Sequence, residues 1–260
     1  MENDRVPSRV PAPGKAVLLC AVLSAACGEG VPILMYHSVG DGGDPLTVSP
    51  QELEEQLDFL QSAGFETITL GQVLDARDGS AKLPRHPVVL TFDDGYLDAS
   101  TAVLPRLLAR GQKATFFVVS GFCGRDPSVR VVDGHRQYLV WPEVRALDQA
   151  GMEIGSHTVT HRRLTGLHRA ELHAEVEQSR ATLQLYVSRP VEFFAYPYND
   201  QMPWVRHVVE KAGYRGAVVG AHGNNDPFTL QRLTMHRGIS AADLRSMLAE
   251  SWETTYTEGG

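Results

Sequence analysis

Two short stretches of the sequence combine residue types that bind metal ions and move protons. The first is the apolar run from Pro87 to Phe92, which ends in Asp93, Asp94 and Gly95. A buried carboxylate without a partner loses several kcal/mol of hydration, so paired acids at the end of an apolar run require compensation. Because ligands and metals bind at the carboxyl ends of strands in α/β folds, the run predicts a site at its end.

The second stretch contains His157 and His161, which also follow a β-rich segment directly. Two histidines four residues apart are expected to meet on one side of a helical turn, where they suit two ligands of one ion. Alone, such a pair is more often a cap or a surface feature than a metal site. With a carboxylate on the same strand-end face, the two imidazoles suit zinc or another divalent first-row ion, leaving open positions for water and substrate.

Asp93 and Asp94 cannot be equivalent ligands, because successive side chains that leave a strand point in different directions. One carboxylate can complete the ligand set while the other accepts a proton from bound water, whose pKa the ion lowers toward neutrality. Gly95 allows the backbone to turn sharply beneath the site. These residues predict a metal-assisted hydrolase. In the structural alternative, one aspartate caps the following helix and the other is solvated.

The elements that must position these residues alternate between helices and strands. Several helical segments end at a glycine that is followed at once by a β-rich segment, as left-handed helix stops do. These glycines are Gly64, Gly111, Gly151 and Gly213. Strands that alternate with helices indicate βα units and a parallel sheet, so we expect a single-domain α/β fold. About seven such units fit a closed or nearly closed (β/α) barrel better than an open sheet.

Residues 1–30 differ in composition from the catalytic domain that we expect over residues 31–260. Three basic residues precede an apolar run from Ala16 to Cys27, which is too short to span a bilayer and is typical of a signal peptide. The stretch Leu23 to Cys27 also resembles a bacterial lipoprotein box. We therefore expect a secreted or cell-envelope protein of a bacterium, with the frayed tail of a cytoplasmic protein as the alternative.

The composition argues against several classes of partner. The chain has 260 residues, 43% of them hydrophobic, which is enough for one sizeable core. The net charge is −7 and the basic residues form no block, so we expect no nucleic acid partner. We expect no transmembrane span, because the N-terminal apolar run is too short. Cys20, Cys27 and Cys123 form neither a disulfide framework nor a C-x-x-C metal site. The oligomeric state is not predicted.

The two motifs together resemble the first two motifs of the polysaccharide deacetylases, the NodB homology group or carbohydrate esterase family 4. The resemblance runs from Val31 to Leu248 and includes the stretch Phe194 to Tyr198. The start of the chain and the Tyr-Pro-Tyr form are most similar to the subgroup that acts on poly-N-acetylglucosamine. The resemblance implies a distorted (β/α)7 barrel and a metal-dependent hydrolase that removes N-acetyl groups from an amino sugar in a glycan or glycoconjugate.

The resemblance also implies a role for each residue of the two motifs. Asp93 matches the general base, which activates a metal-bound water for attack on the acetamide carbonyl. Asp94, His157 and His161 match the ligands of one divalent ion, with zinc as the first choice and Co, Ni, Mn or Fe as alternatives. Tyr196, Pro197 and Tyr198 match a groove wall, where the backbone N–H of Tyr198 would help to hold the oxyanion, an interaction worth about 3 kcal/mol.

Later residues are matched less specifically. His236 fits the general acid of many relatives, with a packed or surface histidine as the alternative. Ala195 stands where many relatives have an arginine that orients the catalytic aspartate, unless Arg232 fills that role from another strand. Asn199 stands where a glycine commonly follows the Tyr-Pro-Tyr. His37, at the end of the first expected strand, is the best of the remaining histidines for facing the site.

Trp141, which precedes an expected helix, is a further candidate for a supporting residue of the site.

Other classes of function compete with a deacetylase. A mononuclear iron oxygenase uses two histidines and a carboxylate, but its usual scaffold is all-β. A glycosidase needs two carboxyl groups about 5 Å or more apart across a bond, which neighbours on one strand supply badly. A glycan-binding or scaffolding protein of the same fold with impaired turnover is the non-enzyme alternative.

Overall fold

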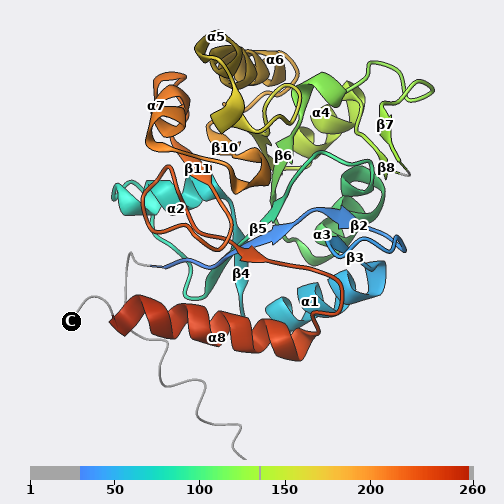
Figure 1. Cartoon of the computed structure of the whole chain (residues 1–260). Coiled ribbons are helices and arrows are strands. Elements are labelled where there is room, and N and C mark those ends of the chain that lie inside the picture. Colours follow the sequence, from blue (N-terminus) through green and yellow to red (C-terminus); the bar gives the residue numbers. More distant parts are fainter. Residues whose placement is uncertain (1–29, 135, 258–260) are drawn as a thin grey trace, which may run out of the picture.

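Figure 1 shows the protein as a computed structural model, which describes residues 30–134 and 136–257. The segment predicted to be signal-like lies outside the described residues, apart from Gly30. Within the described ranges, none of the helices has both the length and the apolar character needed to cross a membrane.

A curved parallel sheet forms the centre of the molecule. Its strands are β1 (Ile33–Tyr36), β4 (Glu66–Ile68), β5 (Pro87–Phe92), β6 (Thr115–Val118), β9 (Glu153–Ser156), β10 (Phe193–Ala195), β11 (Gly216–Val218) and β12 (Leu233–Thr234). Their order across the sheet is β11-β10-β9-β6-β5-β1-β12, and β4 also pairs with β5. Every pairing in this sheet is parallel, so all the strands end at the same edge.

Helices surround this sheet, as Figure 1 shows. They are α1 (Pro50–Ser62), α2 (Leu70–Arg77), α3 (Leu104–Arg110), α4 (Trp141–Gln149), α5 (Arg169–His173), α6 (Ser179–Gln184), α7 (Pro203–Lys211) and α8 (Ala241–Thr257). Wider helical turns, η1 (Ala99–Val103) and η4 (Ala174–Gln178), precede α3 and join α5 to α6. Short tight turns, η2 (Ser120–Phe122), η3 (Leu164–Gly166) and η5 (Pro197–Asn199), lie in loops that follow β6, β9 and β10. The expected α/β fold is confirmed.

Two small pairs of strands lie outside the main sheet. β2 (Ser38–Val39) pairs with β3 (Thr47–Val48), and β7 (Val132–Asp133) pairs antiparallel with β8 (Arg136–Gln137). The second pair lies between β6 and α4.

No helix lies between β11 and β12, the last strand. The alternation of helices and strands in the sequence does not predict this connection. Between β11 and β12 the chain runs as an irregular segment that hydrogen-bonds along β11, with the Val219 N–H donating to the Leu230 carbonyl. β12 then pairs with β1 at the other edge of the sheet. The segment at residues 227–234 therefore bridges the two edge strands and nearly closes the barrel. It also carries Arg232 to the site.

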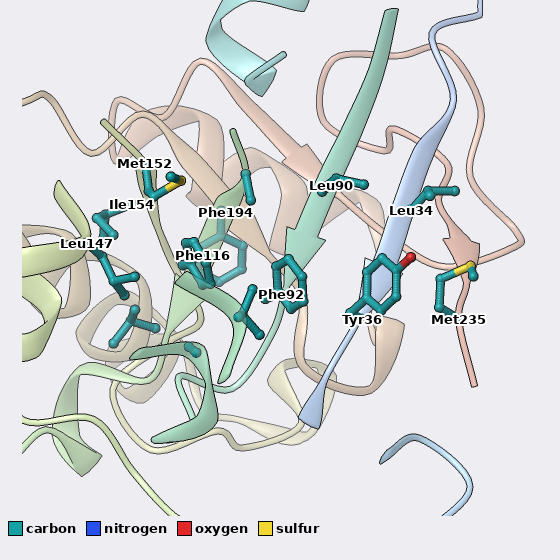
Figure 2. Close-up of a cluster of buried hydrophobic side chains, with 14 of the residues drawn as sticks. Leu34, Tyr36, Leu90, Phe92, Phe116, Leu147, Met152, Ile154, Phe194 and Met235 are labelled. Atoms are coloured by element: carbon teal, nitrogen blue, oxygen red, sulfur yellow. The ribbon is translucent and has the colours of Figure 1, made fainter. Parts of the chain in front are cut away.

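The largest hydrophobic cluster lies between the sheet and its helices. Figure 2 shows Tyr36, Phe92 and Phe116 side by side on the neighbouring strands β1, β5 and β6. The rings of Tyr36 and Phe92 stack at 5.0 Å between centroids, and those of Phe92 and Phe116 at 5.2 Å, both with an interplanar angle of 17°. The parallel register places these rings opposite one another, so the aromatic ladder fixes the strand pairing directly before the carboxylates.

The opposite face of the same strands carries a smaller apolar cluster followed by polar residues. Along β5, Val89 belongs to this cluster, Thr91 is fully buried, and Asp93 comes next on the same face. Phe117 packs there against the backbone of Gly155, where an added Cβ would lie 2.5 Å from its ring. At the amino end of β9, Glu153 accepts hydrogen bonds from the Leu70 and Gly71 N–H groups and thereby caps α2. Polar side chains thus lie at both ends of the enclosed face, with the apolar cluster between them.

Replacing Phe92 with alanine should destabilise the metal-free protein by about 3–5 kcal/mol, because the side chain is 2% exposed and stacks on both sides. Leu108→Ala is the control, since Leu108 is 52% exposed on α3 and its loss should change stability by about 0.5 kcal/mol or less. Urea unfolding measures both variants. Equal effects of the two substitutions would contradict a structural role for the aromatic ladder.

Candidate metal and catalytic centre

The two carboxylates stand where β5 ends, and the backbone there turns sharply. The Asp93 N–H donates to the Tyr36 carbonyl, so this residue still follows the strand. Asp94 has a φ of 71° and Gly95 a φ of 74°, both in the left-handed region. This turn directs the two neighbouring side chains apart, as the sequence predicts. Asp93 and Asp94 are 3% and 7% exposed, so both require cationic partners.

Asp94 meets both histidines of the second motif. Its Oδ1 lies 3.4 Å from the His157 Nε2 and 3.2 Å from the His161 Nε2, and the two nitrogens are 3.2 Å apart. Ligand atoms about 2.0–2.1 Å from a tetrahedral ion lie about 3.3–3.4 Å from each other. The three atoms therefore form one face of a tetrahedron of the right size for a first-row divalent ion. Together they are the Asp94–His157–His161 cluster.

Hydrogen bonding fixes the orientation of His157. Its Nδ1 lies 2.8 Å from the Ala195 carbonyl oxygen at the end of β10. Because a carbonyl oxygen only accepts, Nδ1 carries a proton, so Nε2 is the nitrogen of this ring that can bind an ion in the cluster. Burial alone would lower the pKa of His157, but Asp94 and Asp93 raise it above the usual value. Ion binding and protonation therefore compete for the Nε2 of this imidazole.

The two histidines do not lie on a helical turn, so that part of the sequence prediction is wrong. Residues 157–161 form an irregular loop in which Thr158 and His161 have φ values of 69° and 58°. The Thr158 hydroxyl accepts a hydrogen bond from the His161 N–H at 2.9 Å. The Thr158 carbonyl in turn accepts one from the Ser120 N–H. The loop turns back through these bonds and brings the two rings to 4.8 Å between centroids.

Glu175 on η4 holds this loop, and the sequence analysis missed it. Its carboxylate accepts hydrogen bonds of 2.8 Å from the N–H groups of both Val159 and Thr160 and another from the Thr160 hydroxyl. The side chain is 6% exposed. Its sequence position could have revealed it, because Glu175 stands next to Val176 and three residues after Leu172. These residues share the buried face of a helical stretch.

Arg232 neutralises Asp93 in a buried bidentate pair. Its two terminal nitrogens lie 2.7 Å from the two oxygens of the carboxylate, and Arg232 is only 1% exposed. The guanidinium also donates to the Thr91 hydroxyl and the Val219 carbonyl. Burial alone would raise the pKa of Asp93, but Arg232 holds it below the usual range. Arg232 therefore pairs with Asp93 from the segment before β12. It takes the role that many relatives give to an arginine at the position of Ala195.

Backbone strain in the described part of the chain is concentrated at this edge of the sheet. The non-glycine residues with positive φ there are Asp94, Thr158, His161, Tyr198 and Asn199. All of them follow strands that end at the site. Asparagine tolerates the left-handed region better than most residues, which explains how Asn199 replaces the common glycine. Left-handed conformations clustered in this way are typical of binding and catalytic sites.

His37 lies beside the carboxylates, at the end of β1. Burial lowers the pKa of this histidine, whereas the nearby Asp93 and Asp94 act in the opposite direction. Its Nδ1 is buried and has no hydrogen-bond partner among the described residues. A polar atom left in this state next to a charged cluster is available to a ligand.

The Tyr-Pro-Tyr segment contributes one side chain to the site. The Tyr198 ring is 54% exposed and lies 4.8 Å from the His161 ring. Pro197 is buried, and Tyr196 is a core residue whose hydroxyl donates to the Phe228 carbonyl. Of the three residues matched to a groove wall, only Tyr198 has its ring against a member of the cluster.

Two further candidates lie away from the Asp94–His157–His161 cluster. Trp141 is buried at the start of α4, and its ring stacks on Tyr186 at 4.0 Å. His236 follows β12, is exposed, and directs its Nδ1 to the Arg237 carbonyl at 2.9 Å. The structure assigns neither residue a contact with the cluster.

The family model of the polysaccharide deacetylases matches residues 80–217, which is more than half of the chain. The chain therefore belongs to the polysaccharide deacetylase family, as its two motifs implied. This match includes both carboxylates of β5 and both histidines of the loop after β9. The class of protein that the fold and the site define is thus that of deacetylases acting on carbohydrates.

Individual relatives agree with this class. The chain is 27% identical to YxkH of Bacillus subtilis over 82% of its own length and 74% of that protein. It is 30% identical to the poly-beta-1,6-N-acetyl-D-glucosamine N-deacetylase of Escherichia coli over 50% of its length, but this match spans only 21% of the enzyme.

Solved structures share the fold. The Streptococcus pyogenes deacetylase PplD, in complex with acetate, has a TM-score of 0.74 at 21% identity, covering 84% of this chain and 97% of that one. IcaB from Ammonifex degensii has a TM-score of 0.71 at 23% identity, with the same coverage of both chains. These likenesses confirm the barrel-type α/β fold.

Replacing Arg232 with methionine should destabilise the metal-free protein at pH 7 by about 3–5 kcal/mol, because Asp93 remains buried without its cation. In the wild type the pKa of Asp93 is lowered, so its contribution to stability is present at neutral pH and is lost only on strong acidification. In the variant, burial raises the pKa of Asp93, so Asp93 opposes folding increasingly as the pH rises above its unfolded pKa of about 3.9.

The difference between the two proteins should therefore shrink as the pH falls from 7 toward 4.5, measured by urea unfolding with a chelator present. Arg215→Met is the control, since Arg215 pairs with partly exposed acids and should cost less than about 1 kcal/mol. A loss of stability in Arg232→Met that does not change with pH would contradict the pairing.

Replacing Glu175 with glutamine should weaken the binding of a divalent ion by about 10- to 100-fold, because the amide has no negative charge and its NH2 group cannot accept the hydrogen bond of the Thr160 hydroxyl. Competition with a chromogenic chelator measures the affinity of the metal-free protein. Glu177→Gln is the matched control, since Glu177 is exposed on the same turn and its side chain bonds only His173 among the residues that the structure describes. Equal affinities in the two variants would show that Glu175 does not support the cluster.

Proposed function

We propose that the protein is a metal-dependent N-deacetylase that hydrolyses the acetamide of an amino sugar in an N-acetylated glycan. The observation that carries this proposal is the spacing of the Asp94–His157–His161 cluster directly beside the Asp93–Arg232 pair. Membership of the polysaccharide deacetylase family supports a carbohydrate substrate. The name of the Escherichia coli relative points to N-acetylglucosamine as the sugar.

Asp94, His157 and His161 are the residues that would hold the ion, and zinc suits their two nitrogens and one oxygen. A divalent ion at this place supplies Lewis-acid chemistry, which polarises an amide carbonyl and lowers the pKa of a water molecule. The carboxylate of Asp94 is ready to serve as a ligand. Burial alone would raise its pKa, but hydrogen bonds from the two imidazoles hold it well below the usual value.

Asp93 acts as the base in this proposal. Arg232 keeps its carboxylate ionised at neutral pH and fixes both oxygens in direction. A carboxylate held in this way accepts the proton of the attacking water only briefly, because its pKa is low. The proton is then available for the amine that leaves. Arg232 is thus a positioning residue that orients the base.

A second group near the scissile bond can pass this proton to the departing amine, and two histidines are candidates. His37 lies beside Asp93 and has an unpartnered buried nitrogen. His236 is the residue that the family resemblance favours, and its ring is exposed beyond β12. Tyr198 completes the proposed site, since its ring packs on His161 and its backbone stands at the position matched to the oxyanion donor.

A glycan-binding protein without turnover is the alternative, and the pairing of Asp93 argues against it. Such a protein has no need of an ionised, oriented carboxylate next to a ligand cluster. Burying an ion pair brings little net stability compared with apolar residues of similar volume, so Asp93 and Arg232 are better explained by chemistry.

The roles of Asp93 as base and His157 as ligand separate in two variants. Asp93→Asn should bind about one divalent ion per chain and lower acetate release from N-acetylglucosamine oligomers at least about 100-fold, because the general base is lost while the ligands remain. His157→Ala should lose both the ion and the activity. Metal analysis and an enzymatic acetate assay on the same samples measure both properties.

His173, which is partly exposed on α5 and pairs with Glu177, provides the control, since His173→Ala should keep both metal and activity. Full activity of Asp93→Asn would show that another group is the base. Full metal content of His157→Ala would remove the imidazole from the ligand set.

A further inference from the structure

A hollow of about 410 Å³ opens next to the cluster and is lined by His161, Arg162, Arg163, Gly166, Leu167 and Tyr198. Its two sides come from the loop after β9 and the loop after β10. The Asp200 carboxylate joins them by accepting hydrogen bonds from the Thr165 N–H and hydroxyl at 3.1 Å and 2.7 Å. The hollow shares His161 with the proposed metal ligands. A sugar next to the one that reacts can therefore reach it.

Arg163 lies across the wall of this hollow. Its guanidinium carbon is 4.4 Å from the centroid of the Tyr198 ring, whose other neighbour is the His161 ring at 4.8 Å. Stacking on an aromatic face leaves the N–H groups at the guanidinium edge free for a planar anion. The arginine is thus held in place without using its hydrogen-bond donors.

The two arginines of the hollow differ in their partners. Arg162 is engaged by Glu171 at 2.9 Å. The nearby Asp200 carboxylate is engaged by Thr165. Arg163 makes no ion pair with any residue that the structure describes. An unpaired arginine beside a reaction centre favours an anionic group on the substrate.

We propose that Arg163 is a specificity-determining residue that binds a carboxylate on the sugar next to the one that is deacetylated. This inference rests on the proposed N-deacetylase function and narrows its substrate class to acidic N-acetylated glycans. A carboxylate offers two oxygens in a plane, which match the edge of the guanidinium in a bidentate contact. The carboxylate can belong to a uronic acid or to a lactyl ether, which present the same chemistry.

The test compares substrates that differ only in the carboxylate. The first is an oligosaccharide of alternating N-acetylglucosamine and glucuronic acid, and the second is the same oligosaccharide with its carboxyl groups reduced to alcohols. A lactyl-bearing oligosaccharide and its amide form the second arm, which distinguishes the two sources of the carboxylate. The measured quantity is the ratio of kcat/KM for the acidic substrate to that for its neutral match.

The wild type should prefer at least one acidic substrate by about tenfold, and Arg163→Gln should bring that ratio close to one. Arg169→Gln is the control for a general loss of positive charge, since Arg169 is exposed, lies outside the hollow and has no ion pair among the described residues. It should keep the ratio. The preference of the wild type should also fall as the salt concentration rises.

Equal kcat/KM for acidic and neutral substrates in the wild type would overturn the inference and leave the deacetylase function intact. The same conclusion follows if Arg163→Gln keeps the preference. Absence of acetate release from every substrate, N-acetylglucosamine oligomers included, would instead overturn the proposed function. Thermal unfolding of Arg163→Gln confirms that a lost preference does not reflect a lost fold.

Discussion

Two neighbouring carboxylates are buried where β5 ends, and each of them needs a positive partner. Asp93 has the guanidinium of Arg232, and Asp94 has the imidazoles of His157 and His161. Neither acid is stable in this place without its partner, because an ionised carboxylate loses most of its hydration there. The sharp turn at Asp94 separates the two environments within one peptide unit. Each carboxylate alone would be costly to bury, but the two have different partners and therefore different chemistry.

The fold delivers these partners from two places, since both histidines follow β9 and Arg232 directly precedes β12. The segment that closes the barrel between β11 and β12 carries Arg232. The carbonyl of Ala195 at the end of β10 selects the tautomer of His157, and Glu175 on η4 holds the loop that carries His161. Because the strands are all parallel, these groups meet at one edge of the sheet. Left-handed backbone at five residues of the same edge reflects how closely the loops are constrained.

The sequence contains enough to predict the α/β fold and the grouping of the two motifs. The helix-terminating glycines show the alternation, and the apolar run before Asp93 identifies a buried strand. The irregular loop of His157 to His161 could not be predicted from local spacing, because Glu175 determines it from a distant helix. The partner of Asp93 could be suspected from the lack of an arginine at Ala195. Only the tertiary path of residues 227–234 places Arg232 beside it.

The most direct test of this account is a metal titration of the metal-free protein in which bound zinc and acetate release from N-acetylglucosamine oligomers are measured on the same samples. The account predicts no acetate without the ion and a release that rises in proportion to bound zinc until one ion is held per chain. Full acetate release by protein that holds no metal would contradict the role given to Asp94, His157 and His161.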